Sequence, residues 1–135
     1  MPLRRFFDRY AELSQRAEPE ELAAMYAPTF IVAGPQGSRA FANDAAFLAW
    51  LKQVFEFNQT HGMRSLVVIS IYEVVLSPRH SLATVKWGTQ FTKTGDRLIE
   101  FEIAYLVENA AGGWTILSYI SRSDQDEDMK KHGVL

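Results

Sequence analysis

The chain has 135 residues, a length that fits one domain with a hydrophobic core of its own. Hydrophobic residues make up 47% and charged residues 22%, as in ordinary globular proteins, and the net charge of −2 offers no basic surface for nucleic acid. The absence of cysteine excludes disulfides, cysteine-ligated metals and a thiol nucleophile.

No segment approaches the roughly 20 apolar residues needed to cross a bilayer. The arginines in the first ten residues, MPLRRFFDRY, are not followed by a long apolar run, so no secretory signal is expected. Glycine-rich phosphate loops and metal-ligand spacings of histidine are also absent from the sequence. We therefore expect a cytoplasmic protein without a cofactor, a metal or a membrane partner.

Two helices are predicted at the start of the chain. The first has apolar residues at helical spacing between Leu3 and Leu13, with charged residues between them. The second begins at Pro19, a favoured first-turn residue, and ends before Pro28. Residues 29–33 then predict a short strand, followed by the turn-rich sequence GPQGS.

A third helix and a set of strands are predicted to follow. Asn43 is the expected N-cap of this helix, and its apolar stripe runs over residues 47–55. Residues 65–76 are apolar or β-branched at nearly every position, which predicts a strand covered on both faces. Residues 82–92 and 99–107 alternate apolar and polar side chains around the turn sequence TGD.

The last predicted strand covers residues 114–121, after a glycine-rich turn. Three helices, a short strand and an antiparallel meander make an α+β domain over residues 1–122. Residues 123–135 are strongly polar and predict a charged C-terminal tail or a short helix. Because the helices can cover only one face of the sheet, a second copy of the chain is expected on the other face, so we expect a homodimer through the sheet.

Three segments carry a resemblance to a known superfamily: FFDRYAEL, EELAAMYAPTFIV and IAYLVENAAGGWTILSYIS. Their order resembles the nuclear-transport-factor-2-like superfamily, which includes SnoaL-like polyketide cyclases and ketosteroid isomerases. The resemblance implies a cone-like curved antiparallel β-sheet whose concave face carries the three N-terminal α-helices, around a largely apolar pocket. Members include enzymes, binding proteins and dimeric scaffolds, so the fold leaves the function open.

Within that resemblance, Tyr10 falls where the isomerases keep an oxyanion-stabilising tyrosine, and their second oxyanion donor falls close to Tyr105. The general-base aspartate of the isomerases falls near Gly34, where this chain has no carboxylate. Because proton abstraction next to a carbonyl needs a base within reach, steroid isomerisation is not expected.

Tyr10 and Tyr105 are the candidate catalytic residues, because two inward hydroxyls can polarise a ligand carbonyl. The alternative is a pair of buried tyrosines bonded to backbone or water. The ligand-binding candidates are the remaining side chains expected on the pocket wall: Tyr26, Trp50, Phe55, Trp87, Ile103, Ile116, Ser118 and Arg122.

The last hairpin has two possible registers, and they place different side chains in the pocket. If Ile116 faces inward beside Tyr105, Ser118 and Arg122 also face the cavity. A slip by one residue turns Leu117 and Tyr119 inward instead. The isomerase-like alignment favours the first register, so the segment is interpreted as a pocket wall with a polar lip.

Other reactive side chains favour structural roles. Alternation places Glu100 and Glu102 on the outer face of the sheet. Counting back through the hairpin predicts Gly88 opposite Glu102 and Gln90 opposite Glu100, with Lys86 diagonal to Glu102. The three histidines are expected on the surface, His61 being a candidate for the pocket mouth. No serine lies in a GxSxG motif, and no histidine or aspartate is placed in the sequence to activate one.

Two functions follow as hypotheses. The first is a SnoaL-like domain that binds a small apolar, ring-bearing ligand in an aromatic-lined pocket; if it is an enzyme, isomerase, cyclase or dehydratase chemistry is expected. The alternative is a non-catalytic dimeric binding or scaffold module whose pocket is filled by its own side chains.

Overall fold

A computed structural model describes residues 2–110 and 113–122. The predicted charged segment 123–135 lies outside the described residues. In chain order the helices and strands are α1 (Pro2–Gln15), α2 (Pro19–Ala23), β1 (Tyr26–Gly34), β2 (Gly37–Ala42), α3 (Ala45–Thr60), β3 (Met63–Val75), β4 (His80–Phe91), the short 3₁₀ turn η1 (Thr92–Thr94), β5 (Ile99–Ala110) and β6 (Gly113–Ser121).

The described strands form one six-stranded sheet in the order β2-β1-β6-β5-β4-β3. All neighbours are antiparallel except β1 and β6, which run parallel, so the sheet is mixed rather than purely antiparallel. Strand β2 was not predicted, because the turn signal GPQGS obscured a hairpin in which Gly34 pairs with Gly37. The α+β class and the three N-terminal helices agree with the prediction.

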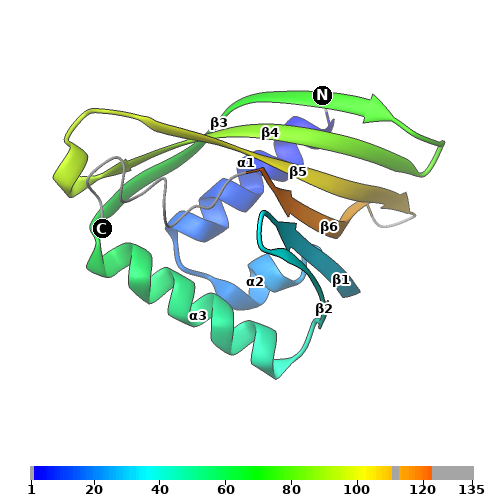
Figure 1. The fold of residues 1–135 in the computed structure, drawn as a ribbon, viewed down its shortest axis with the longest axis horizontal. Helices are drawn as coiled ribbons and strands as arrows, with labels where there is room; N and C mark the ends of the chain where they lie inside the picture. Colours follow the sequence, from blue (N-terminus) through cyan, green and yellow to red (C-terminus); the bar gives the residue numbers. More distant parts are fainter. Residues whose placement is uncertain (1, 111–112, 123–135) are drawn as a thin grey trace.

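All three helices lie on one side of the curved sheet, as Figure 1 shows. Helix α1 buries Leu3, Phe7, Ala11 and Leu13 against it. Two of its polar side chains also reach the free edge of β3: Gln15 Nε2 donates to the Leu66 carbonyl at 2.8 Å, and an Arg4 Nη2 donates to the Val68 carbonyl at 2.9 Å. The helix therefore satisfies part of the sheet edge that has no neighbouring strand.

The start of α3 differs from the prediction by one residue. Asp44 is the N-cap, and its Oδ1 accepts a hydrogen bond from the Phe47 backbone at 3.1 Å. Asn43 instead donates from Nδ2 to the carbonyls of Ala23 and Tyr26, at 2.7 and 3.1 Å. The amide thus joins the end of α2 to the start of β1.

The face of the sheet opposite the helices keeps apolar side chains exposed. Tyr72 is 71% exposed, and Val67, Val74 and Ile120 are also exposed. Strand pairing joins Tyr72 to Thr84, Thr84 to Ala104 and Ala104 to Ile120, so these side chains form one row across four strands. We call this surface the outer face.

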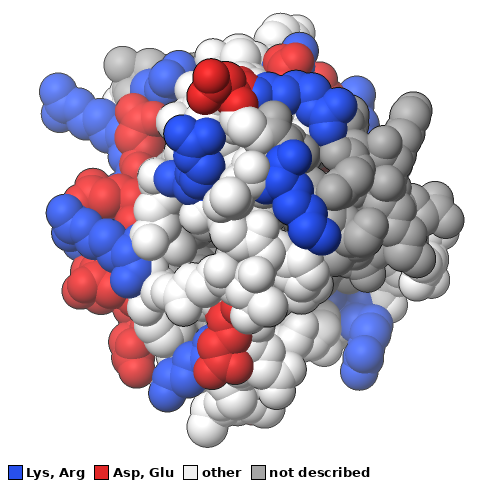
Figure 2. All heavy atoms as spheres, turned by 90° about the vertical axis from the view of Figure 1, so that its left-hand side faces the viewer, with Lys and Arg blue, Asp and Glu red and all other residues white. Residues whose placement is uncertain are grey.

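The surface elsewhere mixes both charges. In the view of Figure 2, lysine and arginine side chains are interspersed with acidic ones around an uncharged centre. The described residues of that side therefore form no continuous basic surface of the kind that nucleic acids bind. No helix in the described ranges is long and apolar enough to span a membrane.

Candidate functional site

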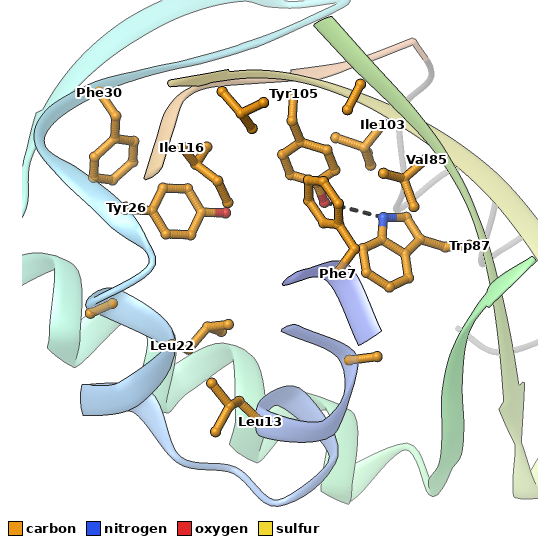
Figure 3. Packing of buried hydrophobic residues seen from close by; sticks show 14 of the residues in the cluster. Phe7, Leu13, Leu22, Tyr26, Phe30, Val85, Trp87, Ile103, Tyr105 and Ile116 are labelled. Carbon is orange, nitrogen blue, oxygen red and sulfur yellow. Dashed lines mark hydrogen bonds between the residues drawn. The ribbon is translucent and has the colours of Figure 1, made fainter. Parts of the chain in front are cut away.

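Aromatic rings fill the deep part of the space between α1 and the sheet. Phe7 lies at the centre, with its ring centroid 4.7 Å from that of Tyr105 and 6.2 Å from that of Trp87. Tyr26 and Tyr105 point into this space from β1 and β5, as Figure 3 shows. Because Phe7, Trp87 and Tyr105 are almost fully buried, these rings belong to the hydrophobic core as well as to the candidate site.

Four polar groups meet within these rings. The hydroxyls of Tyr10 and Tyr26 lie 2.7 Å apart, and Trp87 Nε1 donates to the Tyr105 hydroxyl at 3.1 Å. The rings of Tyr10 and Tyr105 also lie together, with centroids 6.0 Å apart, and their hydroxyls influence each other's pKa. We call Tyr10, Tyr26, Trp87 and Tyr105 the hydroxyl cluster.

The three tyrosines of the hydroxyl cluster have raised pKa values. Burial raises the pKa of Tyr26 and of Tyr105 well above the ordinary tyrosine value. Burial also raises the pKa of Tyr10, although its hydrogen bond to Tyr26 and the nearby Tyr105 hydroxyl act in the opposite direction. All three hydroxyls are therefore neutral near pH 7, when they can donate hydrogen bonds but are poor bases.

The hydroxyl cluster has more donor hydrogens than its internal bonds use. Three hydroxyls and one indole N–H supply four donor hydrogens. The two hydrogen bonds, Trp87 to Tyr105 and Tyr10 with Tyr26, consume two of them. Even if Tyr105 also donates to Tyr10, one hydroxyl hydrogen is left over on Tyr10 or Tyr26.

Two open hollows of the described structure lie elsewhere. One, of about 550 Å³, lies between the start of α1 and β3 and is lined by Arg4, Arg5, Ile69, Ser70 and Ile71. The other, of about 310 Å³, lies between the α1–α2 connection and α3. Neither hollow is lined by the hydroxyl cluster. A ligand would therefore have to approach the hydroxyl cluster beside Tyr10 and Tyr119, which are half-buried and keep some accessible surface.

Most of the predicted inward residues lie together. Tyr10, Tyr26, Trp87 and Tyr105 form the hydroxyl cluster, and Ile103 and Ile116 are fully buried in the same core. Tyr26 begins β1, although the sequence pattern placed it on the second helix, because α2 ends at Ala23.

Two predicted ligand-binding residues on α3 lie away from the hydroxyl cluster. Trp50 is 52% exposed and stacks on Phe47 from the solvent side, so the prediction that it lines the pocket is wrong. Phe55 is buried but faces the second hollow, beside Ala17 and Pro19. When apolar residues cover much of the circumference of a helix, the sequence does not indicate which of them pack against the sheet.

The placement of Ser118 and Arg122 in the cavity is also wrong. Ile116 pairs with Val107 and Ser118 with Leu106, so Leu117 is an extra residue in β6. This β-bulge exchanges the two faces of the strand. Ile116 faces inward before it and Tyr119 faces inward after it, whereas Ser118 donates to the Ile31 carbonyl and Arg122 pairs with Glu102 at 3.2 Å.

The glutamate pair lies on the outer face, as predicted. Lys86 pairs with Glu102 in the ladder and Gly88 with Glu100, two residues away from the predicted register. A shift of two keeps each side chain on its face, so the assignment survives the register error. Lys86 Nζ lies 3.6 Å from Glu100, in an exposed ion pair of small energetic value.

Two inward residues were not among the candidate site residues: Phe7, and Tyr119, which only the alternative register of the last hairpin turned inward. Phe7 lies one helical turn before Tyr10, and that spacing could have identified it. Tyr119 contacts Tyr105 with ring centroids 5.5 Å apart, and only the bulge brings it inward. His61, proposed for the pocket mouth, has Nδ1 2.9 Å from the Phe57 carbonyl, which is a local contact at the end of α3.

A family comparison agrees with this architecture. Residues 3–124 match the family described as NTF2-like protein (DUF6841). The chain belongs to this NTF2-like family. None of the curated proteins matches the chain.

Solved structures share the NTF2-like fold at low sequence identity. An NTF2-like protein with a cystatin-like fold from Novosphingobium aromaticivorans superposes with a TM-score of 0.72 at 14% identity, over 90% of this chain and 79% of that one. A candidate scytalone dehydratase from the same organism gives 0.64 at 18%, over 91% and 82%. A ketosteroid isomerase-like protein from Erwinia carotovora atroseptica gives 0.59 at 18%, over 84% and 86%. These likenesses establish the fold.

Proposed function

We propose that this NTF2-like chain binds a small, ring-bearing, apolar ligand against the hydroxyl cluster, with a ligand carbonyl accepting the surplus hydroxyl hydrogen. The observation that carries the proposal is the count of four donor hydrogens for two internal hydrogen bonds. Rings on α1, β1, β4 and β5 supply the apolar surroundings. A hydrogen bond in such surroundings gains strength because water does not compete for it.

Any reaction on this site relies on polarisation rather than on proton abstraction. A neutral tyrosine donor stabilises negative charge that develops on a carbonyl oxygen. Among the described residues, no carboxylate or imidazole hydrogen-bonds to the hydroxyl cluster. Cyclisation or dehydration of an activated substrate fits this set of groups better than isomerisation by a base. The fold neighbours named for scytalone and ketosteroid substrates support a ring-bearing ligand at the level of the fold.

Binding of the bicyclic ketone 1-tetralone tests this function. In the wild-type protein, we expect chemical-shift changes at Tyr10, Tyr26 and Tyr105 that saturate with 1-tetralone concentration. Shift changes confined to the α3 hollow, or to the outer face, would contradict the proposal. A ligand bound in the α3 hollow would instead perturb Phe55 and Lys52.

A second candidate function rests on the outer face. We propose that the outer face joins two copies of this chain, because exposed apolar side chains lie on it at β3 (Val67, Tyr72 and Val74) and at β6 (Ile120). In a purely structural module the aromatic rings would serve as core alone, and the homodimer would be the functional unit. The 1-tetralone titration separates the two candidates, since a structural module would not bind the ketone at the hydroxyl cluster.

A further inference from the structure

The turn between β3 and β4 brings together a serine, a histidine and a glutamate. Ser77 Oγ lies 2.9 Å from His80 Nδ1, and His80 Nε2 lies 3.3 Å from Glu108 Oε2. Glu108 comes from β5, where it pairs with His80 in the ladder. The turn and this end of β5 lie side by side at one end of the sheet in Figure 1. The sequence analysis found no histidine placed to activate a serine, so this arrangement corrects it.

Ser77 and Glu108 flank the two ring nitrogens of His80. The Glu108 carboxylate lies 3.3 Å from Nε2, and its negative charge favours the neutral tautomer with the hydrogen on Nε2. In that tautomer Nδ1 has a free lone pair, which accepts from the Ser77 hydroxyl. The imidazole is then positioned as a base for the serine proton, with the Glu108 carboxylate beside it.

The backbone of the turn fixes the Ser77 oxygen. The N–H groups of Arg79 and His80 donate to Oγ at 3.2 and 3.0 Å. With these two donors on Oγ, its own hydrogen is directed to His80. The same N–H groups stabilise negative charge that develops on Oγ as the proton leaves.

The surroundings of the turn suit a small apolar substrate. Ser77 and His80 are half-buried, and the preceding residues Val75 and Leu76 are 69% and 57% exposed. The Arg79 guanidinium, 3.6 Å from Glu108, lies in the same turn and can donate to an oxyanion. Apolar contact for an acyl or aryl group and a donor for its carbonyl oxygen therefore flank the serine.

We propose that Ser77, His80 and Glu108 form an acyl-transfer site for small apolar esters, separate from the hydroxyl cluster. Ser77 Oγ attacks the ester carbonyl carbon while its proton passes to His80 Nδ1. The tetrahedral intermediate then breaks its bond to the leaving alcohol, which takes the proton from His80. Water hydrolyses the acyl-serine by the same route in reverse, so the carboxylic acid is released and the serine is restored.

The test uses the full chain with two probes, p-nitrophenyl acetate and a fluorophosphonate. We expect the fluorophosphonate on Ser77 by peptide mass spectrometry, and p-nitrophenol release at least about 10-fold faster than from Ser77→Ala. Ser70→Ala, which removes an exposed serine of β3, should leave both results unchanged. A label on another residue, no label, or equal rates for wild type and Ser77→Ala would overturn the proposal.

Two further variants separate chemistry from folding. His80→Ala should lose the activity, and added imidazole should restore part of it, which a merely structural role of His80 does not predict. For the positioning role of Glu108, Glu108→Ala should lose acylation and Glu108→Asp should regain part of it. If Ser77→Ala does not fold, the fluorophosphonate site in the wild-type protein decides alone.

Discussion

Trp87, Tyr10, Tyr26 and Tyr105 each place one polar atom within an apolar core, and each atom has a partner. No buried side-chain nitrogen or oxygen in the described residues lacks a hydrogen bond. A buried donor that loses its partner costs about 1–3 kcal/mol, more than the bond itself contributes. The four groups therefore stabilise the fold as a set, and removing one partner affects the others.

Trp87→Phe removes the indole N–H that Tyr105 accepts and leaves a smaller ring. We expect the free energy of unfolding to fall by about 2 kcal/mol or more. Trp50→Phe, on the exposed side of α3, should change it by less than about 0.5 kcal/mol. Urea unfolding of both variants measures this, and equal effects would show that the indole bond has no special role.

The raised pKa values of Tyr10, Tyr26 and Tyr105 predict loss of stability in alkali. Above about pH 10 the unfolded chain ionises these hydroxyls while the folded chain keeps them protonated, so unfolding releases protons and stability falls as pH rises. Each group contributes a slope of about 1.4 kcal/mol per pH unit until its folded pKa is reached.

Urea unfolding between pH 8 and pH 11, on wild type and Tyr26→Phe, measures this slope. The variant lacks one of the three groups, so its stability should decline less steeply above about pH 10. Parallel declines for the two proteins would contradict the assignment of a raised pKa to Tyr26.

At the scale of elements, β6 decides which side chains face the helices. The bulge at Leu117 turns both Ile116 and Tyr119 inward, so neither simple register of the hairpin describes the strand. Alternation predicted the faces of β4 and β5 correctly, because the period of two tolerates a register error of two. A bulge has no comparable sequence signal here, and the outward positions of Ser118 and Arg122 could not be predicted.

Pairing between strands far apart in the chain could likewise not be predicted from the sequence pattern. The helices and the strands of the second half follow from periodicity, and Tyr10 and Tyr105 were placed together through a resemblance. The parallel contact of β1 with β6 joins segments about 90 residues apart, and local propensity does not encode it. The same holds for Ser77, His80 and Glu108, since strand pairing alone brings Glu108 to the turn.

Gly62, between α3 and β3, and Gly95, between η1 and β5, form a matched pair of glycines with positive φ. Gly62 has a φ of +72°, and a Cβ there would lie 2.5 Å from Thr92 Oγ1. Gly95 has a φ of +61°, and a Cβ there would have no other atom within 4 Å. Either substitution to alanine should lower the free energy of unfolding by about 1 kcal/mol because of the left-handed backbone. Gly62→Ala should lower it by about 1–3 kcal/mol more because of the contact with Thr92.

Thermal unfolding of Gly62→Ala and Gly95→Ala compares the two costs. The larger loss should occur at Gly62, whose carbonyl accepts from the Thr92 backbone and hydroxyl at 2.8 and 3.1 Å. A Gly95→Ala variant as unstable as Gly62→Ala would mean that the Thr92 contact relaxes without cost.

At the scale of the whole molecule, the helices cover one face of the sheet and the outer face remains exposed (Figure 1). If two copies meet there, Tyr72→Lys places a charge in the interface and should raise the dimer dissociation constant at least about 10-fold. Trp50→Lys, on α3, is the control and should leave it unchanged. Sedimentation measures the dimer dissociation constants of both variants, and a wild-type protein that is monomeric at high micromolar concentration would refute the dimer.

The central claim, a surplus hydroxyl hydrogen offered to a carbonyl, is tested most directly by comparing 1-tetralone with tetralin, the hydrocarbon without the oxygen. Calorimetric titration of the wild-type protein and of Tyr72→Phe should show the ketone binding about 2- to 10-fold more tightly than the hydrocarbon. Tyr10→Phe breaks the chain of hydroxyls at its middle, and we expect this preference to disappear. Equal affinities for ketone and hydrocarbon in the wild-type protein, or a preference that survives Tyr10→Phe, would contradict the account.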